Sequence, residues 1–444
     1  DVYKRQVQTN VNNSKFNAAK DVTLTAEEAR DIYQLATNVA LGGVAAGANI
    51  AVTTVGQAIT DEDVIAKIDE ANAMYANSEG NDINSMLKGA DDALDTAGIT
   101  DYTPTIGAET GGAGSAITVN ITGSDIDAGD NFNAEAEESG SIGMTLGGAS
   151  GGAVAANAGV GILNINRNVD VNISGGSINA DKVDVGADIS GSTKLNVYQG
   201  SAGVISGNVA YASISNNGNS DITLEGVNLT AKDINAIAKD TTTTNLNAIG
   251  VSAGGVALGA LAAEAANNSD ISITLTGNTV TSESEAGDEE SGNINISTDK
   301  ANTVAAEAIG VAGGAIGGTG MGATVSDNGS SVITLIGNTM QADKNIDVAA
   351  QTNSELTANI SNDAAGVFGG GAVSIAEVNA GSANDRMATA VIIGNGNTFA
   401  AQNTNIGAVS NITQSVDLDA LSISGYGALS GNTATVNAYT DVGI

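Results

Sequence analysis

The chain has 444 residues and a formal charge of −35, with 15 Lys and Arg against 50 Asp and Glu. This charge repels duplex DNA, RNA and anionic lipid, so we expect no nucleic-acid partner. Because the chain has no Cys, disulfides, thiol catalysis and zinc-finger sites are excluded, and its hydrophobic residues are mostly small aliphatics that suit a thin core.

Residues 1–6, DVYKRQ, do not match the rest of the chain. They resemble translated sequencing-adapter sequence, and we interpret them as a non-native leader outside the fold. The chain opens with Asp1 and stops at Ile444 inside what looks like another repeat, so we interpret it as a fragment.

Residues 7–56 are predicted to belong to a β-solenoid. The phrase AKDVTL at Ala19–Leu24 matches AKDINA at Ala231–Ala236, so Val22 corresponds to Ile234. The next segment, TAEEARDIYQLA at Thr25–Ala36, starts like a helix with a capping box, but its phase in the repeat favours strands. We predict strands there.

Residues 57–107 are predicted to be an inserted helical hairpin and linker. From Ile234 to the next strand phrase at Ile273 is 39 residues, whereas from Val22 to Val119 is 97, an excess of 58. Apolar residues at helical spacing fill this excess. They are Val64, Ile65, Ile68, Ala71 and Met74, then Ile83, Met86, Leu87, Ala90 and Leu94. Thr60 can cap the first helix, and we expect the hairpin to project from a corner of the solenoid.

Residues 108–444 carry repeats of about 51–60 residues. Six strand-and-turn phrases such as ITLTGNTV begin at Val119, Val171, Ile222, Ile273, Ile333 and Ile392, at offsets of 52, 51, 51, 60 and 59. A second apolar position follows at Phe132, Val183, Ile234, Ile346 and Ile406. A fixed long period predicts a stacked fold in which each unit packs on its neighbours.

Within ITLTGNTV, Ile273 and Leu275 share one strand face, Gly277 permits a corner, and Val280 is the next inward residue. We expect each repeat to make two or three turns of about 20 residues, giving some 17 turns over about 80 Å. Gly and Ala segments let sheets approach closely. The many Asn, Ser and Thr can satisfy turn backbone or form ladders between turns, and sugar binding is the alternative role for these rows.

Two long uncharged stretches raise the question of membrane helices. Ala308 to Val325 and Ala248 to Ala263 run 18 and 16 residues without a charge. Both are rich in Gly, which disfavours helix, and both recur at the same phase of the repeat. We predict strands.

The acidic run ESEAGDEE at Glu283–Glu290 accounts for the longer fourth offset. It is interpreted as a solvated loop, with a calcium site as the alternative, and the same two interpretations apply to Asp125, Asp127 and Asp130. The ligand and Gly spacing of known calcium loops is missing, so no metal site is predicted. No catalytic or cofactor-binding residue is predicted either.

The GVGGAV-like segments and ITLTGNT phrases resemble the large repetitive adhesins of Gram-negative anaerobes, the leukotoxin-type and filamentous-haemagglutinin-like exoproteins. The resemblance covers roughly Asn17 to Ile444. It implies a right-handed parallel β-helix that acts without a cofactor, extracellular or at the cell surface. It also implies an outer-membrane secretion partner or barrel outside this segment.

The leading functional hypothesis is therefore an exported adhesin or stalk segment that binds host cell-surface or matrix glycoproteins or glycans and is not an enzyme. A polysaccharide-cleaving β-helix enzyme is the first alternative. Aromatic platforms for sugars are missing, however, and Arg167, Lys182 and Lys194 are scattered. A trimeric autotransporter-like head is the second alternative, suggested by AIGVSAGG and AIGVAGG, although such heads repeat about every fourteen residues in known families.

Overall fold

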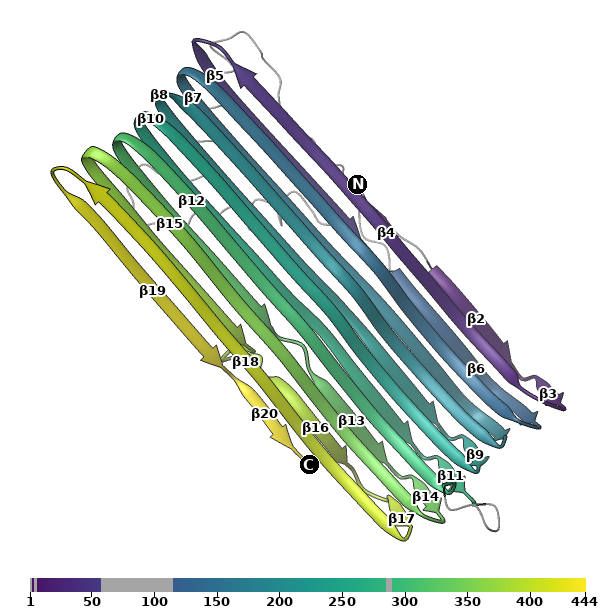
Figure 1. The fold of residues 1–444 in the computed structure, drawn as a ribbon. Coiled ribbons are helices and arrows are strands. Elements are labelled where there is room, and N and C mark those ends of the chain that lie inside the picture. Colours follow the sequence, from purple (N-terminus) through teal and green to yellow (C-terminus); the bar gives the residue numbers. More distant parts are fainter. Residues whose placement is uncertain (1, 4–5, 57–114, 285–289) are drawn as a thin grey trace.

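The computed structural model describes residues 2–3, 6–56, 115–284 and 290–444. These residues form one sheet of long parallel strands, stacked in order as in a β-solenoid (Figure 1). The strands are β1 (Val2–Tyr3), β2 (Gln6–Asn12), β3 (Lys15–Ala18), β4 (Val22–Leu41), β5 (Val44–Val55), β6 (Ser115–Ala128), β7 (Asn131–Asn179), β8 (Lys182–Glu225), β9 (Asn228–Ala231), β10 (Asp233–Thr276), β11 (Thr279–Ser282), β12 (Asn293–Asp327), β13 (Ser331–Ile336), β14 (Thr339–Ala342), β15 (Asn345–Ala380), β16 (Met387–Ile393), β17 (Thr398–Ala400), β18 (Asn403–Ser424), β19 (Ala428–Ala438) and β20 (Thr440–Gly443).

One sequence repeat makes one complete coil. Val183 pairs with Ile234 of the next coil, and Ile234 pairs with Ile294 of the coil after that. The expectation of two or three 20-residue turns per repeat is therefore wrong. The period gives the distance between equivalent positions, and the bends inside a repeat turn the chain back on itself without completing a coil.

The stack is consequently short and its coils are wide. One column of paired residues contains Val22, Phe132, Val183, Ile234, Ile294, Ile346 and Thr404. The six spacings in this column, at about 4.8 Å each, give about 29 Å instead of the expected 80 Å. The long dimension lies along the strands, across the stacking direction (Figure 1).

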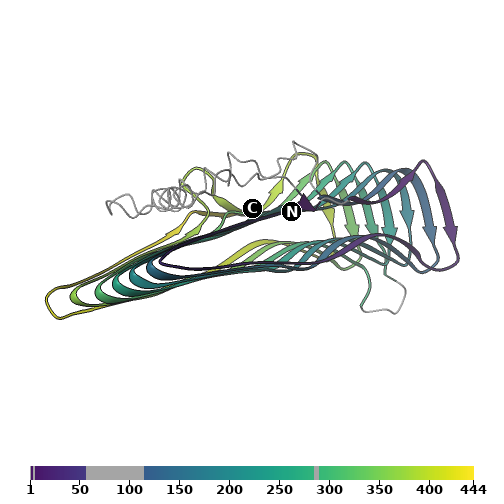
Figure 2. The ribbon, with the colours of Figure 1, turned by 90° about the horizontal axis from the view of Figure 1, so that it is seen from above.

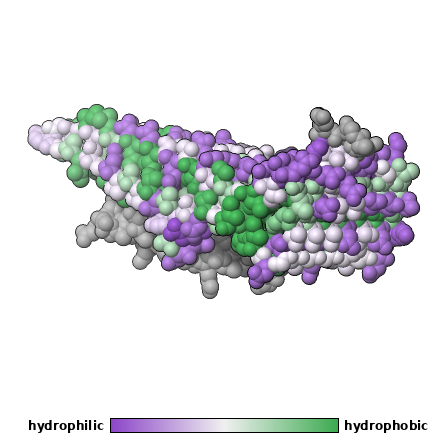
Figure 3. All heavy atoms as spheres, turned by 90° about the horizontal axis from the view of Figure 1, so that it is seen from below, coloured by the Kyte–Doolittle hydropathy of each residue, from purple (hydrophilic) through white to green (hydrophobic). Residues whose placement is uncertain are grey.

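Each coil is a flattened loop that runs out, reverses at a narrow tip and returns (Figure 2). Near the tip, Ser252 Oγ donates a hydrogen bond to the carbonyl of Leu258, only six residues later, at 2.6 Å. Large apolar side chains are exposed around the tips, including Val204, Val367 and Phe368. Figure 3 shows hydrophobic patches over the narrow part and the middle of the molecule, whereas the broad end carries hydrophilic rows interspersed with neutral and weakly hydrophobic ones.

Two hydrophobic clusters fill the interior formed by the described residues. The broad-end cluster includes Ile273, Leu275 and Val280, and the narrow-part cluster includes Leu195 and Leu261. Period-two alternation directs these side chains inward on both runs of a coil. The burial of Val280 confirms that the chain bends at Gly277, which has a positive φ of 65°.

Small residues bring the outward and return runs close together, as predicted for the Gly and Ala segments. A Cβ placed on Gly310 would overlap the Cε of Met321 on the facing run. No side chain larger than hydrogen therefore fits at residue 310 unless Met321 moves.

The predicted asparagine ladders are present, and one of them is buried at a corner. Asn278 Nδ2 donates to Asn338 Oδ1 at 3.0 Å, and Asn338 Nδ2 donates to Asn397 Oδ1 at 3.1 Å. Asn338 Nδ2 also donates to the carbonyl of Leu275, and Asn338 Oδ1 accepts from the backbone N–H of Asn278. The ladder thus provides hydrogen-bond partners for backbone groups at the turn and also links the side chains of neighbouring coils.

Two of the aligned positions are shifted in the last repeat. Ile333 pairs with Val391, so the sixth phrase begins one residue before Ile392. Ile406 pairs with Val348, and the partner of Ile346 is Thr404. Hydrophobicity alone set the predicted phase at both positions. At Thr404 it fails because the equivalent residue is polar, and at Val391 it fails because consecutive apolar residues leave the phase ambiguous.

The N-terminal strands contain residues from two predicted segments, 1–6 and 7–56. Thr25–Ala36 lies within β4, which confirms strands there. Val2 and Tyr3 form β1, and Gln6 opens β2 in register with Ala116, so these residues of the expected leader are strand residues.

The repeat keeps its register across the long insertion. Val55 pairs with Ile165, and Ser115 pairs with Arg167, only two residues further along β7. The helical hairpin predicted within residues 57–107 lies outside the described residues. The stretches Ala248 to Ala263 and Ala308 to Val325 are strands in β10 and β12, as predicted. Among the residues described, no helix has the length and apolarity needed to span a membrane.

Candidate functional site

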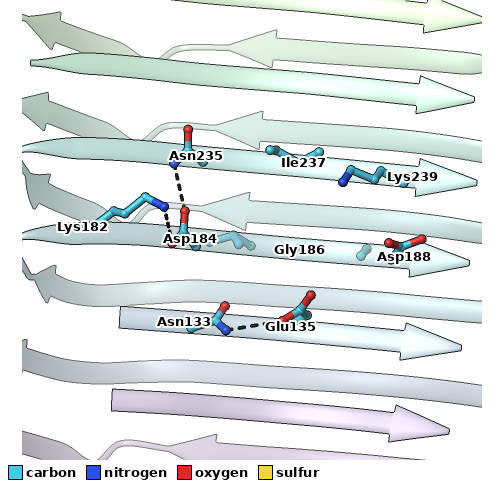
Figure 4. A pocket seen from close by; sticks show the side chains of 11 residues that line it. Asn133, Glu135, Lys182, Asp184, Gly186, Asp188, Asn235, Ile237 and Lys239 are labelled. Atoms are coloured by element: carbon cyan, nitrogen blue, oxygen red, sulfur yellow. Dashed lines mark hydrogen bonds and ion pairs between the residues drawn. The ribbon is translucent and has the colours of Figure 1, made fainter. Parts of the chain in front are cut away.

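A surface groove crosses β7, β8 and β10 at the broad end, where Gly186 carries no side chain (Figure 4). Its volume is about 270 Å³. The lining residues are Asn133, Glu135, Lys182, Asp184, Val185, Gly186, Ala187, Asp188, Asn235, Ile237 and Lys239. We call this feature the Gly186 groove.

The parallel register aligns the outward-facing residues of the Gly186 groove in rows across the strands. The rows are Asn133–Asp184–Asn235, Glu135–Gly186–Ile237 and Glu137–Asp188–Lys239. Because alternate residues of a strand face solvent, each row contains one outward-facing residue from each coil. A Cβ on Gly186 would lie 3.6 Å from Cγ of Glu135, so the glycine leaves room that a larger residue could fill without a backbone clash.

Hydrogen bonds hold the polar side chains of the groove in place. Asp184 accepts a bond from Asn235 Nδ2 at 2.8 Å and lies 3.0 Å from Lys182 Nζ. Asn133 Nδ2 donates to Glu135 at 3.4 Å. The Lys182 pair is partly exposed and adds little stability, so its effect is mainly on side-chain orientation. Amides and carboxylates together offer the donors and acceptors that hydroxyl-rich ligands require.

Burial and, to a smaller extent, neighbouring carboxylates raise the pKa values of Asp188 and Glu137 beside the groove. Burial is the main cause of the raised pKa of Asp188; Lys239 opposes the shift, and Glu135 and Asp299 add to it. The pKa of Glu137 is raised by burial and then by Asp188 and Glu135. Protons are therefore bound here at higher pH than on free carboxylates.

The acidic residues weighed as calcium ligands serve as hydrogen-bond acceptors between coils. Asp125 accepts from Ser177 Oγ at 2.7 Å, and Asp127 accepts from Asn179 Nδ2 at 3.1 Å. The backbone carbonyl of Asp130 accepts from the N–H of Asp181. In the part of the chain that the structure describes, no group of three or more His, Cys, Asp or Glu could hold a metal ion.

The acidic run Glu283–Glu290 is described only at its ends. Glu283, Ser284 and Glu290 are described, and the five residues between Ser284 and Glu290 are not. Both the backbone N–H and the hydroxyl of Ser284 donate to Asp343 Oδ2, at 2.9 and 3.0 Å. This end of the loop is therefore tied to the next coil.

The three scattered cations remain apart. Arg167 is buried and lies 3.7 Å from Glu138, whereas Lys182 lines the Gly186 groove. Lys194 pairs with Gly143, twelve residues along β8 from Lys182. They form no common site.

A buried polar layer separates the two hydrophobic clusters, and the sequence analysis missed it. Its seven ionisable members are Glu28, Arg30, Glu138, Arg167, Asp240, Lys300 and Asp327, each at most 7% exposed. Four of them, Glu28, Glu138, Asp240 and Lys300, occupy one column of the outward run. The sequence does indicate that these four side chains point inward. Each lies six residues after an inward-facing apolar residue such as Val22, and an even spacing along a strand keeps side chains on the same face.

The N-terminal half of the polar layer is a chain of ion pairs. Arg30 lies 2.6 Å from Glu28 and 3.4 Å from Glu138, and Glu138 is 3.7 Å from Arg167. Burial raises the pKa of Glu138, while Arg30 and Arg167 oppose the shift. Burial also lowers the pKa of Arg167.

In the C-terminal half of the polar layer, Lys300 contacts the carboxylate of Asp327 and is paired across neighbouring strands with Asp240. Lys300 Nζ is 2.7 Å from Asp327 Oδ1, and both side chains are fully buried. Asp240 accepts a hydrogen bond from Asn302 Nδ2 at 3.1 Å. Burial raises the pKa of Asp240 to about 6, even though Lys300 lowers it.

Comparison with known proteins gives no relative. No family model matches the chain. Neither a curated protein nor a solved structure matches it.

Proposed function

We propose that the chain is a segment of an exported adhesin or surface stalk of a Gram-negative bacterium, built as a right-handed parallel β-solenoid. It binds host glycans or glycoproteins through its outer faces and does not cleave them. The observation that carries the proposal is the Gly186 groove. It lies on a continuous stack of coils and is lined by amide, carboxylate and ammonium groups.

Polar rows on the return run give the proposal a second support. Asn217 donates to Asn164 at 3.0 Å, Asn268 donates to Asn217 at 2.9 Å and Asn328 donates to Asn268 at 2.8 Å. Each row repeats one chemical group at the strand spacing of about 4.8 Å. A rigid row loses little conformational entropy on binding, which favours contact with a long, repetitive ligand.

Export agrees with the composition. A chain without Cys forms no disulfides that would hinder passage in an unfolded state. The secretion partner or outer-membrane barrel would lie outside the present sequence. The groove carboxylates Glu135 and Asp188 also keep the polysaccharide-cleaving alternative open, and the experiment distinguishes the two.

The test compares binding by wild-type protein with binding by a groove-filling variant. Beads carrying wild-type protein are expected to adhere to epithelial cells and to retain host glycans on an array. Gly186→Leu should reduce binding about tenfold, because its side chain fills the groove. Ala349→Leu is the matched control, since residue 349 lies in the same row three coils away, and it should bind as wild type.

Two results would count against the adhesin proposal. Release of reducing ends or unsaturated products from a polysaccharide panel would establish the enzyme alternative. Equal binding by wild type, Gly186→Leu and Ala349→Leu would show that the groove is not the contact surface.

A further inference from the structure

Lys300 and Asp327 meet inside one coil, from opposite runs of the same strand. Both belong to β12, 27 residues apart, with the narrow tip between them. Their side chains are 0% exposed, and Lys300 Nζ lies 2.7 Å from Asp327 Oδ1. A primary amine and a carboxyl group are thus in contact in the interior.

Further hydrogen bonds fix both groups. Lys300 Nζ donates to the carbonyl of Gly329 at 2.6 Å, and the N–H of Gly329 donates to Asp327 Oδ1 at 3.2 Å. Ser354, from the next coil, donates to Asp327 Oδ2 at 2.7 Å. Groups held in this way react with effective molarities on the order of 10⁵–10⁸ M.

A third buried ionisable residue, Asp240, lies in the strand next to Lys300. Asp240 pairs with Lys300 in the neighbouring coil and is 0% exposed. Its Oδ2 accepts from Asn302, whereas its Oδ1 makes no hydrogen bond among the described residues. Its raised pKa of about 6 means that this carboxyl keeps its proton at higher pH than an ordinary aspartate.

We propose that Lys300 and Asp327 condense to form an intramolecular amide cross-link. The lysine nitrogen forms a bond to Cγ of Asp327, and one bond from Cγ to a carboxylate oxygen breaks. Starting from the ammonium and carboxylate, two protons leave the nitrogen with that oxygen as one water molecule, and the amide keeps one N–H. Asp240 is the acid that lends a proton to the departing oxygen and recovers one from the nitrogen.

The surroundings favour the neutral product. A buried ion pair retains the cost of removing two charges from water, whereas an amide carries no net charge. The cross-link would connect the outward and return runs and close a loop around the tip. This inference concerns the interior and does not depend on the proposed binding function.

The first measurement is the intact mass of the purified, folded chain, followed until it is constant. We expect a mass about 18 Da below that of the sequence, because one water is lost. Trypsin does not cut after an acylated lysine. The peptide Asp240–Lys344 should therefore stay joined at Lys300, with no backbone fragment ions between residues 300 and 327.

Variants assign the bond to these residues. Lys300→Arg keeps the positive charge but should show the full sequence mass. Asp327→Asn should lose about 17 Da instead, because ammonia leaves. Asp240→Asn should slow the mass loss at least tenfold, with circular dichroism verifying that β structure is retained.

An exposed pair in the same chain is the matched control. Lys232 Nζ lies 3.0 Å from Asp181 Oδ2, and the two side chains are 35% and 52% exposed. We expect trypsin to cut normally after Lys232. An unchanged mass for the wild-type chain would overturn the proposal. So would a loss of 18 Da that hydroxylamine reverses, or one that leaves cleavage at Lys300 intact, since either indicates a succinimide.

Discussion

Removing one rung of the buried corner ladder, by Asn338→Ala, should cost far more stability than removing a rung on the outer face. Asn338 is fully buried, and its amide bonds the carbonyl of Leu275 and the backbone N–H of Asn278 as well as the side chains on either side. After truncation these two backbone groups lose their partner. Each buried unpaired group costs about 1–3 kcal/mol.

The expected loss in the free energy of unfolding is about 2–3 kcal/mol, at the low end of the sum, because the space left by the amide can admit a water. Asn268→Ala is the matched control. Its amide bonds Asn217 on a half-buried outer row, where water replaces the lost partner, so we expect less than about 1 kcal/mol.

Urea unfolding followed by circular dichroism measures both changes as shifts of the midpoint at constant slope. The reasoning would be refuted if the two variants lost the same stability. A larger loss for Asn268→Ala would refute it as well.

Three further outcomes follow from other features. Gly310→Ala should lower the melting temperature, because its Cβ would overlap Met321, whereas Gly313→Ala, with open space around it, should melt within about 2 °C of wild type by calorimetry. Folding raises the pKa of Asp240 from 3.8 to about 6, so the folded state binds more protons in that range, and the contribution of Asp240 to stability falls by about 2 kcal/mol as pH rises from 4 to 6. Asp240→Asn should flatten this part of a urea-midpoint profile, and an unchanged profile would contradict the shift. Rising salt should promote end-to-end association, since within the part of the chain that the structure describes β4 and β18 each pair on one edge only, and screening weakens the repulsion of a highly acidic chain. A monomer at all ionic strengths in sedimentation would contradict it.

Local chemistry made much of the fold predictable from the sequence. Alternation around Ile273 and Leu275 gave the inward face, and Gly277 marked the corner. The phase of Val22 identified Thr25–Ala36 as strand despite its helix-like composition, because burial in the stack outweighs intrinsic propensity.

The size of a coil was not predictable in the same way. Corner signals such as Gly277 show where the chain bends, but they do not show whether the bend completes a coil or returns along the same one. That choice depends on whether the two runs can pack face to face, as Gly310 and Met321 do. It is a property of residues far apart in the sequence.

The Gly186 groove and the polar layer were harder to predict from the sequence than the fold. The Gly186 groove arises from a missing side chain between rows on three coils, and only the register brings Glu135 and Asp188 beside it. The polar layer could have been found by following inward phase through Asp240 and Lys300, but those residues were counted simply as charges.

The identity of repeat and coil bears on how such a protein can change its length. Because Val183 meets Ile234 in the same way that Phe132 meets Val183, an in-frame duplication of the 51 codons of one repeat would insert a complete layer. Both neighbouring layers would keep equivalent partners, and the stack would lengthen by about 4.8 Å. Unequal recombination between repeats could therefore lengthen or shorten this protein in whole layers, without a new interface having to evolve.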